Sequence, residues 1–472
     1  MTTPVLSLSG LDPTSSEPIY RQLYWRFREA IHKGLLKPGD RVPAARALAK
    51  ELGLARGTID SAYSLLTSQG YLQSRGQAGT RVAYGICDTA SAPLAMAQPL
   101  ALQQQTIRQP SPLLPFQMGV PALDAFPRKI WAQISARCVR ATQSQDLANP
   151  SAYGLQALRA AIATYLQVSR GISCSPAQVF ITAGYRETLS LIAHAVLTPT
   201  DRVLIEDPGY PPTRRLLEGL HITPVPIPVD QDGLCVARAL EAGHHARAAV
   251  VTPAHQSPLG VSLSLPRRLA LLEWAREQQA WIVEDDYDGE YRYVSRPLPA
   301  LKSQDRDGRV LYSGTFSKVL FPAMRLAYVV APEALVERFE QTCEAFQSGC
   351  PELSQAIVAT FMAEGHFARH IQRMRKLYSE RRTMAVNGLK SVLGERIQID
   401  ANPGGMHLIL RLRPPQSDRV MVQRMRKAGL FAEALSEWQQ QGEPASGLLL
   451  GFANIDSLAT AQALARRILA LM

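Results

Sequence analysis

The residues best suited to covalent chemistry lie in one short stretch, SGTFSK, which ends at Lys318. A lysine amine can condense with an aldehyde to give a Schiff base. Thr315 and Ser317 supply hydroxyl donors, and Arg325, seven positions after the lysine, carries a planar fork that suits a phosphate. The pattern predicts a site for an aldehyde cofactor with a phosphate, which is pyridoxal 5'-phosphate (PLP). On this string alone, a solvated Ser-Lys turn is the alternative.

A second group of phosphate-binding donors follows an earlier apolar run. QVFITAGYRE has the pattern of a strand, a glycine turn and the start of a helix, which leaves Gly184, Tyr185 and Arg186 at a helix N-terminus. Free backbone amides and the helix dipole favour an anion at such a position. The sequence therefore predicts that this turn contributes to the phosphate site.

Two further strand ends offer groups for the ring of the cofactor. WIVEDDY places Asp285 and Asp286 after an apolar run, where one carboxylate could hold a protonated pyridine nitrogen and keep the ring an electron sink. Tyr287 could bond the phenolic oxygen of the ring, and Tyr210, in EDPGY, could stack on its face. Alternatively, the carboxylates cap helices and the tyrosines only pack. Their joint occurrence after strands favours the cofactor site, because α/β folds bind ligands there.

The elements that must position these residues alternate between short apolar strands and helices over residues 113–472. This alternation predicts an α/β domain with a mostly parallel sheet. Long helical patterns begin near residue 335 and are followed by strands at MHLILRL and GLLLGFANI. We therefore expect a large part over about residues 150–335 and a smaller C-terminal α/β subdomain over about residues 336–472.

Size and composition favour a multi-domain globular protein. The chain has 472 residues, 46% hydrophobic and 19% charged, and its net charge of +11 favours an anionic partner. Six scattered cysteines form no CxxC or Cys/His cluster, so neither a disulfide framework nor a metal site is indicated. The N-terminus lacks the features of a secretion signal, and no apolar run has membrane-spanning length. We expect a cytoplasmic protein without a membrane partner.

A basic segment near the N-terminus has a different pattern. Residues 17–84 hold eleven Lys/Arg against five Asp/Glu. One amphipathic helix ends at the KPGD turn, helical patterns follow at Ala44–Leu52 and Arg56–Gln69, and YLQSRGQAGTRVAY alternates like a hairpin. This order predicts a multi-domain chain whose residues 12–84 form a winged helix-turn-helix that binds double-stranded DNA. A small helical dimerisation module is the alternative. Residues 85–112, rich in Ala, Pro, Gln and Ser, have the composition of a linker.

The stretch LKPGDRVPAARALAKELGLARGTIDSAYSLLTSQGYLQSRGQAGTRVA resembles the DNA-binding domain of the GntR family. By that resemblance, the helix that starts near Arg56 enters the major groove, where Arg56 and Thr58 lie at or near base edges. The resemblance also implies that Arg41 and Arg46 approach the DNA backbone or bases, and that the hairpin with Arg75 and Gly76 touches the minor groove. Where the family usually has serines at the helix starts, this chain has Ala44, Ala45 and Ala55. Each hydroxyl cap lost in this way costs about 0.5 to 2 kcal/mol.

The region after the linker resembles the fold type I aminotransferases. Its motifs EDPGYP, VTPAHQSPLG, IVEDDYDGEYRY and SGTFSKVLFPAMRLAY, joined to a GntR-type head, resemble the MocR subfamily of transcription regulators. The resemblance implies that PLP is the cofactor and that Lys318 forms the Schiff base. It makes Asp285 the partner of the pyridine nitrogen, with Asp286 as the alternative.

The same resemblance assigns the remaining site residues. Tyr210 stacks on the ring, and Tyr287 and the loop from His255 to Pro258 lie on the side of the phenolic oxygen. The implied phosphate cup consists of Gly184, Tyr185, Arg186, Thr315, Ser317 and Arg325. Two of these depart from the family pattern, because a small residue followed by Gln is usual where Tyr185 and Arg186 stand. Asn149 replaces a tyrosine through which a partner subunit contacts the phosphate, and Tyr153 is a possible substitute. Candidates to grip an effector carboxylate are Arg214, Arg215, Arg411 and Arg413.

A DNA-binding head joined to a cofactor domain predicts a transcription regulator. We expect it to bind promoter DNA and to sense either PLP itself or an amine that displaces the lysine. Sensing requires that the ligand binds two arrangements of the domains with different affinities. The resemblance implies a homodimer, whose two heads would set the spacing of operator half-sites. One alternative is an active PLP aminotransferase with an autoregulatory head. Another is a DNA-binding regulator whose vestigial PLP domain serves dimerisation.

Overall fold

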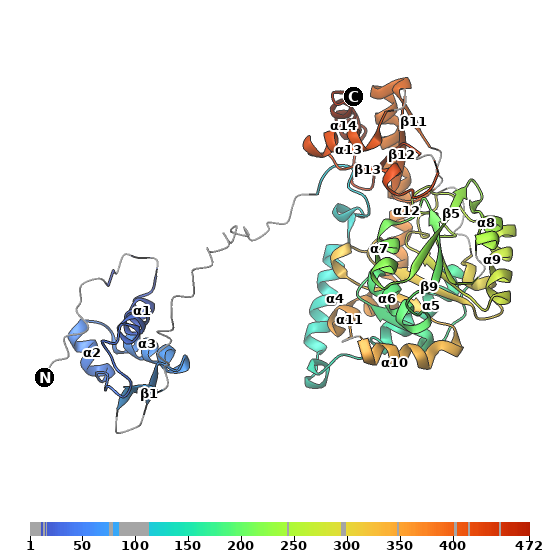
Figure 1. Ribbon diagram of the computed structural model, residues 1–472. Helices are drawn as coiled ribbons and strands as arrows, with labels where there is room; N and C mark the ends of the chain where they lie inside the picture. Colours follow the sequence, from blue (N-terminus) through green and yellow to red (C-terminus); the bar gives the residue numbers. More distant parts are fainter. Residues whose placement is uncertain are drawn as a thin grey trace. The chain divides into compact units, whose positions relative to one another are not determined.

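The computed structural model describes residues 11–12, 15, 17–74, 79–84, 113–242, 245–293, 299–346, 349–400, 404–413, 416–442 and 445–472. The chain divides into two compact units, Met1–Ser111 and Pro112–Met472 (Figure 1). The predicted linker at 85–112 and the predicted DNA contacts Arg75 and Gly76 lie outside the described residues. Within the described residues, every helix is too short or too polar to cross a membrane.

The first unit is a three-helix head with a two-stranded hairpin. Its elements are α1 (Ile19–His32), α2 (Ala45–Leu52), α3 (Arg56–Ser68), β1 (Leu72–Ser74) and β2 (Thr80–Val82), with β1 and β2 antiparallel. The apolar positions of the helices recur at helical spacing and meet in one core, which includes Leu23, Phe27, Leu48, Ile59 and Leu66. The winged helix-turn-helix fold predicted from the sequence is confirmed.

Helices α2 and α3 of the head begin without side-chain caps. Their N-cap residues are Ala44 and Ala55, which have extended backbone and no side-chain capping hydrogen bond. Gly53 ends α2 in the left-handed conformation with φ of 63°, which a glycine adopts at little cost. The two alanines therefore leave the helix-turn-helix without the hydroxyl caps that usually stabilise helix starts.

The second unit is built around an eight-stranded sheet. Its strand order is β3-β10-β9-β8-β7-β4-β5-β6. Strands β4, β5, β7, β8 and β9 are parallel, whereas β10 is antiparallel to both β3 and β9, and β6 is antiparallel to β5. The bounds are β3 Val179–Thr182, β4 Arg202–Asp207, β5 Thr223–Asp230, β6 Gly233–Leu234, β7 Ala246–Val251, β8 Trp281–Asp286, β9 Val310–Thr315 and β10 Ala327–Val330.

Helices cover both faces of this sheet. One face packs on α6 (Tyr185–Val196), α7 (Pro211–Gly219) and α10 (Val336–Phe346). The other packs on α4 (Arg128–Ala141), α5 (Gln156–Arg170), α8 (Val236–Ala242), α9 (Leu265–Glu277) and α11 (Glu352–Ala363). Because both faces are buried, the strands are apolar almost throughout. This is the α/β layer arrangement predicted from the alternating pattern.

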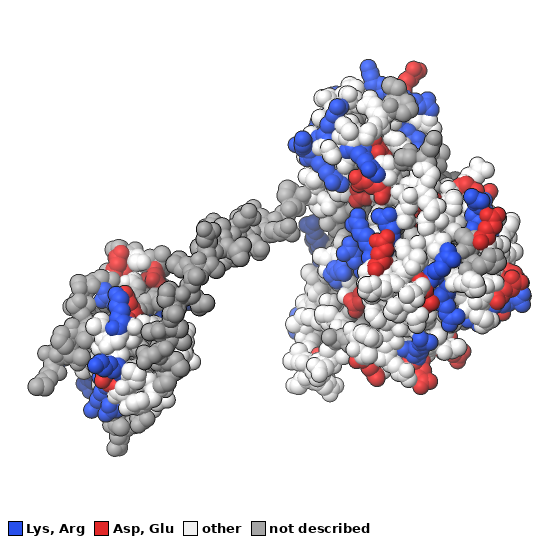
Figure 2. Space-filling view, viewed as in Figure 1, with Lys and Arg blue, Asp and Glu red and all other residues white. Residues whose placement is uncertain are grey.

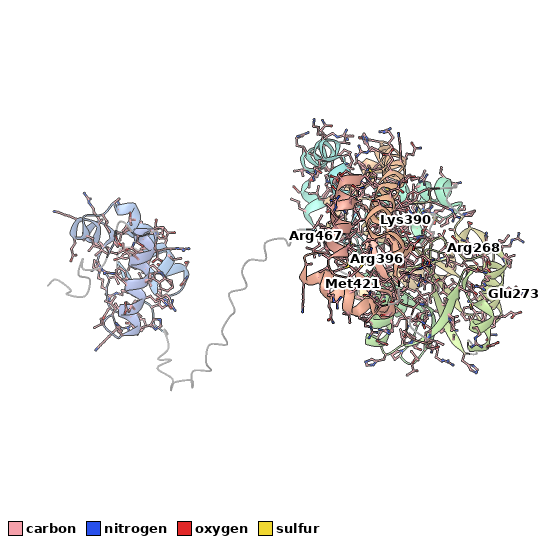
Figure 3. All side chains as sticks on the ribbon, turned by 90° about the horizontal axis from the view of Figure 1, so that it is seen from above. Arg268, Glu273, Lys390, Arg396, Met421 and Arg467 are labelled. Atoms are coloured by element: carbon pink, nitrogen blue, oxygen red, sulfur yellow. The ribbon has the colours of Figure 1, made fainter. Side chains whose placement is uncertain are left out.

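A C-terminal subdomain has its own four-stranded antiparallel sheet. The strand order is β11-β12-β14-β13, with bounds β11 Ile397–Ile399, β12 His407–Leu412, β13 Glu433–Ala434 and β14 Leu448–Gly451. The long helix α12 (His366–Leu393), α13 (Asp418–Lys427) and α14 (Leu458–Leu469) pack against it. Met421 of α13 is buried in this core, whereas Lys390, Arg396 and Arg467 are exposed (Figure 3).

The subdomain differs in two ways from the predicted span of about 336–472. Helices α10 and α11 pack in the cores of the large part, through Phe339 and Phe361. Conversely, the subdomain core includes Phe116 and Ala122 from the start of the unit, and Gly451 N donates to Phe116 O at 2.8 Å. Helical periodicity shows that a face is buried but not which core buries it, so the sequence could not assign these elements.

Candidate cofactor site and nucleic-acid interface

The loops after the parallel strands enclose a cavity of about 420 Å³, here called the main cavity. This volume is in the range of small-molecule sites. Of the residues predicted from sequence, those that line it are Tyr185, Arg186, Tyr210, Asp285, Tyr287, Thr315, Ser317, Lys318 and Arg325. Gly184 lies against Arg325, and His255 contacts Tyr287, so both are one contact away. The structure therefore brings all the predicted cofactor residues to one place.

Lys318 follows β9 and its Nζ donates to the backbone carbonyl of Gly119 at 3.0 Å. Burial lowers the pKa of the Lys318 amine, although nearby Asp288 and Asp285 act in the opposite sense. A lowered pKa increases the fraction of neutral amine, which is the nucleophilic form. Gly119 has a φ of 73°, and a Cβ on it would lie 2.5 Å from Nζ. The lysine is thus held close to a backbone segment that sequence reasoning had not connected with it.

The two neighbouring aspartates have different surroundings. Asp286 accepts from Arg170 Nε at 2.6 Å and from the Tyr312 hydroxyl at 2.6 Å. Asp285 instead lines the main cavity. Burial raises the pKa of Asp285 well above its usual value, and the charge of Asp286 adds to this effect. Only one of the two carboxylates therefore faces the space in which a ring would lie.

The glycine turn before α6 forms the end of the cavity that is best suited to an anion. Gly184 has a φ of 117°, and a Cβ on it would lie 3.1 Å from Nη2 of Arg325. Arg186, in the first turn of α6, and Arg325 both line the cavity. Ser317 N donates to Thr315 Oγ1 at 3.1 Å, which fixes the turn that carries both hydroxyls. Guanidinium groups, hydroxyls and a helix N-terminus are together a favourable set of phosphate donors.

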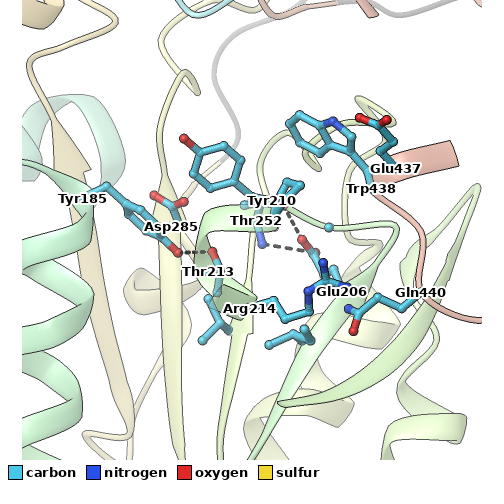
Figure 4. A pocket seen from close by; sticks show the side chains of 14 residues that line it. Tyr185, Glu206, Tyr210, Thr213, Arg214, Thr252, Asp285, Glu437, Trp438 and Gln440 are labelled. Atoms are coloured by element: carbon cyan, nitrogen blue, oxygen red, sulfur yellow. Dashed lines mark hydrogen bonds between the residues drawn. The ribbon is translucent and has the colours of Figure 1, made fainter. Parts of the chain in front are cut away.

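A small side cavity of about 20 Å³ lies beside the main cavity and shares Tyr185, Tyr210 and Asp285 with it (Figure 4). It has room for about one water molecule. Figure 4 shows Asp285 between the two tyrosines, with the Tyr185 hydroxyl 2.7 Å from Thr213 Oγ1. Glu206, on the other side, accepts from Thr252 N at 3.1 Å, and burial raises its pKa to about 7. The Tyr185 hydroxyl is thus already hydrogen-bonded to Thr213.

The C-terminal subdomain supplies a wall that the sequence did not predict. Trp438 contacts Tyr210 with 5.7 Å between ring centroids, and its Nε1 donates to Glu433 Oε2 at 3.1 Å. Asp207, at the end of β4, accepts from the backbone amides of Gln440 and Gln441 at 2.7 and 2.9 Å. Ser257 also lines the cavity and belongs to the predicted loop from His255 to Pro258. The other lining residues that sequence reasoning did not single out are Met118, Gly119, Asp288, Pro322, Met406 and His407. Of these, Asp288 and Pro322 lie within the motifs IVEDDYDGEYRY and SGTFSKVLFPAMRLAY.

The predicted effector arginines lie elsewhere. Arg411 pairs with Asp400 at 2.7 Å, and Arg413 contacts Gln398. Arg214 lines the side cavity, and Arg215 is exposed on α7. None of these four is among the described residues that line the main cavity. Tyr153, the suggested substitute for a phosphate contact at Asn149, donates its hydroxyl to Glu344 and also lies outside the lining.

The head presents its predicted DNA contacts on exposed positions of the helix-turn-helix. Arg46 on α2 and Arg56 at the start of α3 are exposed, and Thr58 is half-buried. Arg56 Nε is 3.4 Å from Asp60 Oδ2, and this solvent-exposed ion pair stabilises the head by little. Arg41 lies against Gly79 at the hairpin, where a Cβ would be 2.9 Å from its Nε. Figure 2 shows several Lys and Arg side chains on the head.

Comparison with known proteins connects these two units. Residues 19–82 match the bacterial regulatory proteins of the gntR family, and residues 111–439 match aminotransferase class I and II. The chain is 35% identical over 456 residues, which cover 94% of this chain and 92% of the relative, to the probable rhizopine catabolism regulatory protein MocR of Rhizobium meliloti. The chain belongs to the MocR subfamily of GntR-type transcription regulators. The family predicted from the motifs is confirmed.

This MocR-type regulator has further relatives of both kinds. It is 34% identical to the HTH-type pyridoxine biosynthesis transcriptional regulator PdxR of Corynebacterium glutamicum, over 96% of this chain and 95% of the relative. Kynurenine aminotransferase of Pyrococcus horikoshii superposes with a TM-score of 0.68 at 25% identity, covering 78% of this chain and 94% of that chain. The fold type I aminotransferase fold is confirmed, and proteins with this fold depend on PLP in general.

Proposed function

We propose that this MocR-type regulator binds PLP in the main cavity and promoter DNA through its head, and that cofactor or amine binding alters DNA binding. The observation that carries the proposal is the convergence of Lys318, Asp285 and Arg325 on one cavity of about 420 Å³. When bound, PLP supplies an aldehyde that condenses reversibly with amines and an electron-poor ring. That chemistry requires an amine, a ring-facing carboxylate and a phosphate cup, and the lining provides each of them.

Each residue then has a distinct task. Lys318 is the attachment point for the cofactor, and its lowered pKa provides neutral amine. Asp285 would hold the proton on the pyridine nitrogen, and Tyr210, which is 40% exposed beside Trp438, would stack its ring on the cofactor. The phosphate would lie at the α6 N-terminus between Arg186 and Arg325, with Thr315 and Ser317 as hydroxyl donors. The effector would be PLP itself or an amine that competes with the lysine.

A visible-absorbance titration tests the cofactor part of the proposal. The purified chain is titrated with PLP beside Lys318→Ala and Lys302→Met. Lys302 is the matched control because its pKa is also lowered by burial, but its Nζ donates to Val310 O, away from the cavity. We expect a visible band in the wild type and in Lys302→Met that is absent from Lys318→Ala. Equal spectra for wild type and Lys318→Ala would leave the domain as a scaffold.

The DNA part is tested with a duplex that covers the region upstream of the gene for this chain. Arg56→Ala should weaken binding of that duplex about tenfold or more, because base contacts are worth about 1 to 3 kcal/mol each. The absorbance titration with PLP should not change. Addition of PLP, and then of individual amines, to the wild-type complex shows which ligand alters affinity. Sustained turnover of amino acids without any effect on DNA binding would instead favour an aminotransferase.

A second copy of this chain is the partner that we propose for the larger unit. Helix α4 buries only Ile134 among its 14 residues. Val139 is 55% exposed and Leu147 is 78% exposed nearby in the chain, which leaves apolar surface without a cover in a single copy. We expect the mass of a dimer by light scattering, and the mass of a monomer for Val139→Glu. A monomeric wild type at micromolar concentration would contradict this assembly.

A further inference from the structure

Three side chains beside the main cavity form a connected polar group. Tyr287 lines the cavity, directly after β8. His255 Nδ1 lies 3.0 Å from the Tyr287 hydroxyl and 3.0 Å from Asp288 Oδ1. His255 is 8% exposed and Asp288 is 1% exposed. Asp288 also lines the cavity, and its buried Oδ2 has no hydrogen-bond partner among the residues that the structure describes.

The proton inventory of this group fixes the direction of its hydrogen bonds. A carboxylate can only accept, and Nδ1 of a histidine either donates one proton or accepts one. With Asp288 as the acceptor, Nδ1 carries its proton and cannot accept from Tyr287. Among the residues that the structure describes, the opposite arrangement would leave both oxygens of the buried Asp288 carboxylate without a donor. It would lose a charge-assisted bond, roughly twice as strong as a neutral one, and gain only a neutral bond. The Nδ1–H tautomer is therefore favoured.

This tautomer leaves the hydroxyl proton of Tyr287 for acceptors on the cavity side. Its oxygen faces the N–H of His255, so the proton must point elsewhere. Ser257, which lines the same cavity, donates to the Tyr287 oxygen and so does not take this proton. A ligand in the cavity can accept it. Asp288, which faces the same space as Lys318, thus influences the direction of a proton that it does not itself bind.

The histidine ring is held in place from two sides. Arg268 anchors the loop that carries it by donating from Nη2 to Pro253 O and from Nε to Leu263 O, both at 2.9 Å. Gly405, from the C-terminal subdomain, lies against the ring edge, and a Cβ on Gly405 would be 2.2 Å from Cε1 of His255. A ring packed in this way cannot rotate freely to exchange one nitrogen for the other. The Nδ1–H group of His255 therefore keeps a fixed direction.

We propose that Asp288 and His255 are positioning residues, which hold the Tyr287 hydroxyl with its proton directed into the main cavity toward the phenolic oxygen of PLP. This inference rests on the proposed PLP site. A hydrogen bond donated to that oxygen favours its anionic form, so loss of the donor raises the pH at which the bound chromophore titrates. The titratable groups that face Tyr287 and His255 are Asp285, Asp288, Glu206, His407 and Lys318, and of these only Asp288 is altered in the test below.

The test is a double-mutant cycle on the PLP-loaded full chain, with Tyr287→Phe, Asp288→Asn and the double variant. An asparagine can donate to Nδ1, which removes the preference for the Nδ1–H tautomer. We expect each single variant to raise the spectral pH midpoint by about one unit and to weaken PLP binding about tenfold. Asp288→Asn also removes a charge that favours protonated Lys318, which by itself lowers the midpoint. The double variant should therefore shift the midpoint upward no further than Tyr287→Phe alone, because the upward effect of the aspartate substitution acts through the tyrosine.

Controls separate this inference from a general loss of structure and from failure of the proposed function. Glu290→Gln removes another buried carboxylate of the same loop, which is absent from the described lining of the main cavity, and should leave the pH midpoint unchanged. His255→Gln serves if Asp288→Asn does not fold, and should raise the midpoint in the same direction. A midpoint for Asp288→Asn equal to that of wild type, or additive shifts in the double variant, would overturn the proposal. A wild type without any PLP-dependent band would instead refute the proposed function.

Discussion

The adjacent carboxylates Asp285 and Asp286 should respond in opposite ways to replacement by asparagine. Asp286 and Arg170 are each 2% exposed and their ion pair is 2.6 Å long. Breaking a buried pair by removing one partner costs about 3 to 5 kcal/mol. Because Glu290 stays 3.3 Å from the same guanidinium, we expect the lower end of this range. Asp286→Asn should therefore reduce the free energy of unfolding by about 3 kcal/mol and leave PLP affinity nearly unchanged.

Asp285→Asn should show the reverse pattern. Burial raises the pKa of Asp285 in the folded chain above its unfolded value, so this group destabilises the folded state once pH exceeds the unfolded value. Asparagine removes that effect, and the cofactor-free variant should be at least as stable as wild type at neutral pH. PLP affinity should fall about 10- to 100-fold, since a hydrogen bond to a charged group is worth about 1.5 to 3 kcal/mol.

Two measurements decide between the aspartates. Urea unfolding of the cofactor-free proteins gives the free energies, and a PLP titration followed by visible absorbance gives the affinities. If Asp286→Asn loses PLP affinity as strongly as Asp285→Asn while its stability is unchanged, the ring nitrogen faces Asp286. The assignment from the Arg170 ion pair would then be refuted.

Three further predictions concern stability and the phosphate site. Ala55→Ser supplies the missing cap of α3 and should stabilise the head by about 0.5 to 1 kcal/mol in calorimetry of the full chain, whereas an unchanged transition would contradict the capping argument. Burial raises the pKa of Glu206 from 4.5 to about 7 in the folded chain. Between these pH values the folded chain retains a proton on Glu206 that the unfolded chain releases, so the free energy of unfolding falls as pH rises. Glu206→Gln should remove only part of that decline in urea unfolding, because burial also raises the pKa of Glu284, to about 7, and of Asp285; an identical pH profile would refute this. Gly184→Ala places a Cβ 3.1 Å from Arg325 at a φ of 117°, and should weaken binding of PLP but not of the duplex; retained PLP affinity would argue against the phosphate assignment.

Those residues of the cofactor site that follow strands could be predicted from the sequence, because the ends of the strands could be predicted. Lys318, Asp285, Tyr210 and Gly184 each follow an apolar run, and the carboxyl ends of parallel strands meet at one edge of a sheet. That argument needs no knowledge of contacts between distant parts of the chain. The choice between Asp285 and Asp286 does need such knowledge, because it depends on the hydrogen bond from Arg170, which lies 116 positions before Asp286.

The residues that form the walls of the site could not be predicted either, because they come from distant parts of the chain. Trp438 and Glu433 belong to the C-terminal subdomain, and Gly119 belongs to the segment that precedes α4. None lies in a motif whose spacing indicates chemistry. The span of the subdomain was equally hidden, because the apolar faces of α10 and α11 would suit either core. In the head, by contrast, helices and hairpin depend on local pattern, and Ala44 and Ala55 could be identified as uncapped starts from their positions alone.

The hydrogen bond from Lys318 to Gly119 has a thermodynamic consequence for the two-unit chain. Gly119 follows the predicted linker by only a few residues, and its segment is held to the C-terminal subdomain through Phe116 O and through Ala122 N, which donates to the Tyr378 hydroxyl at 2.9 Å. A lysine that is bound to a ligand cannot also donate all its protons to that carbonyl. Occupancy of Lys318 would therefore weaken one contact that holds the segment from Phe116 to Ala122. If ligand binding alters DNA binding as proposed, then by reciprocity DNA binding must change ligand affinity by the same factor.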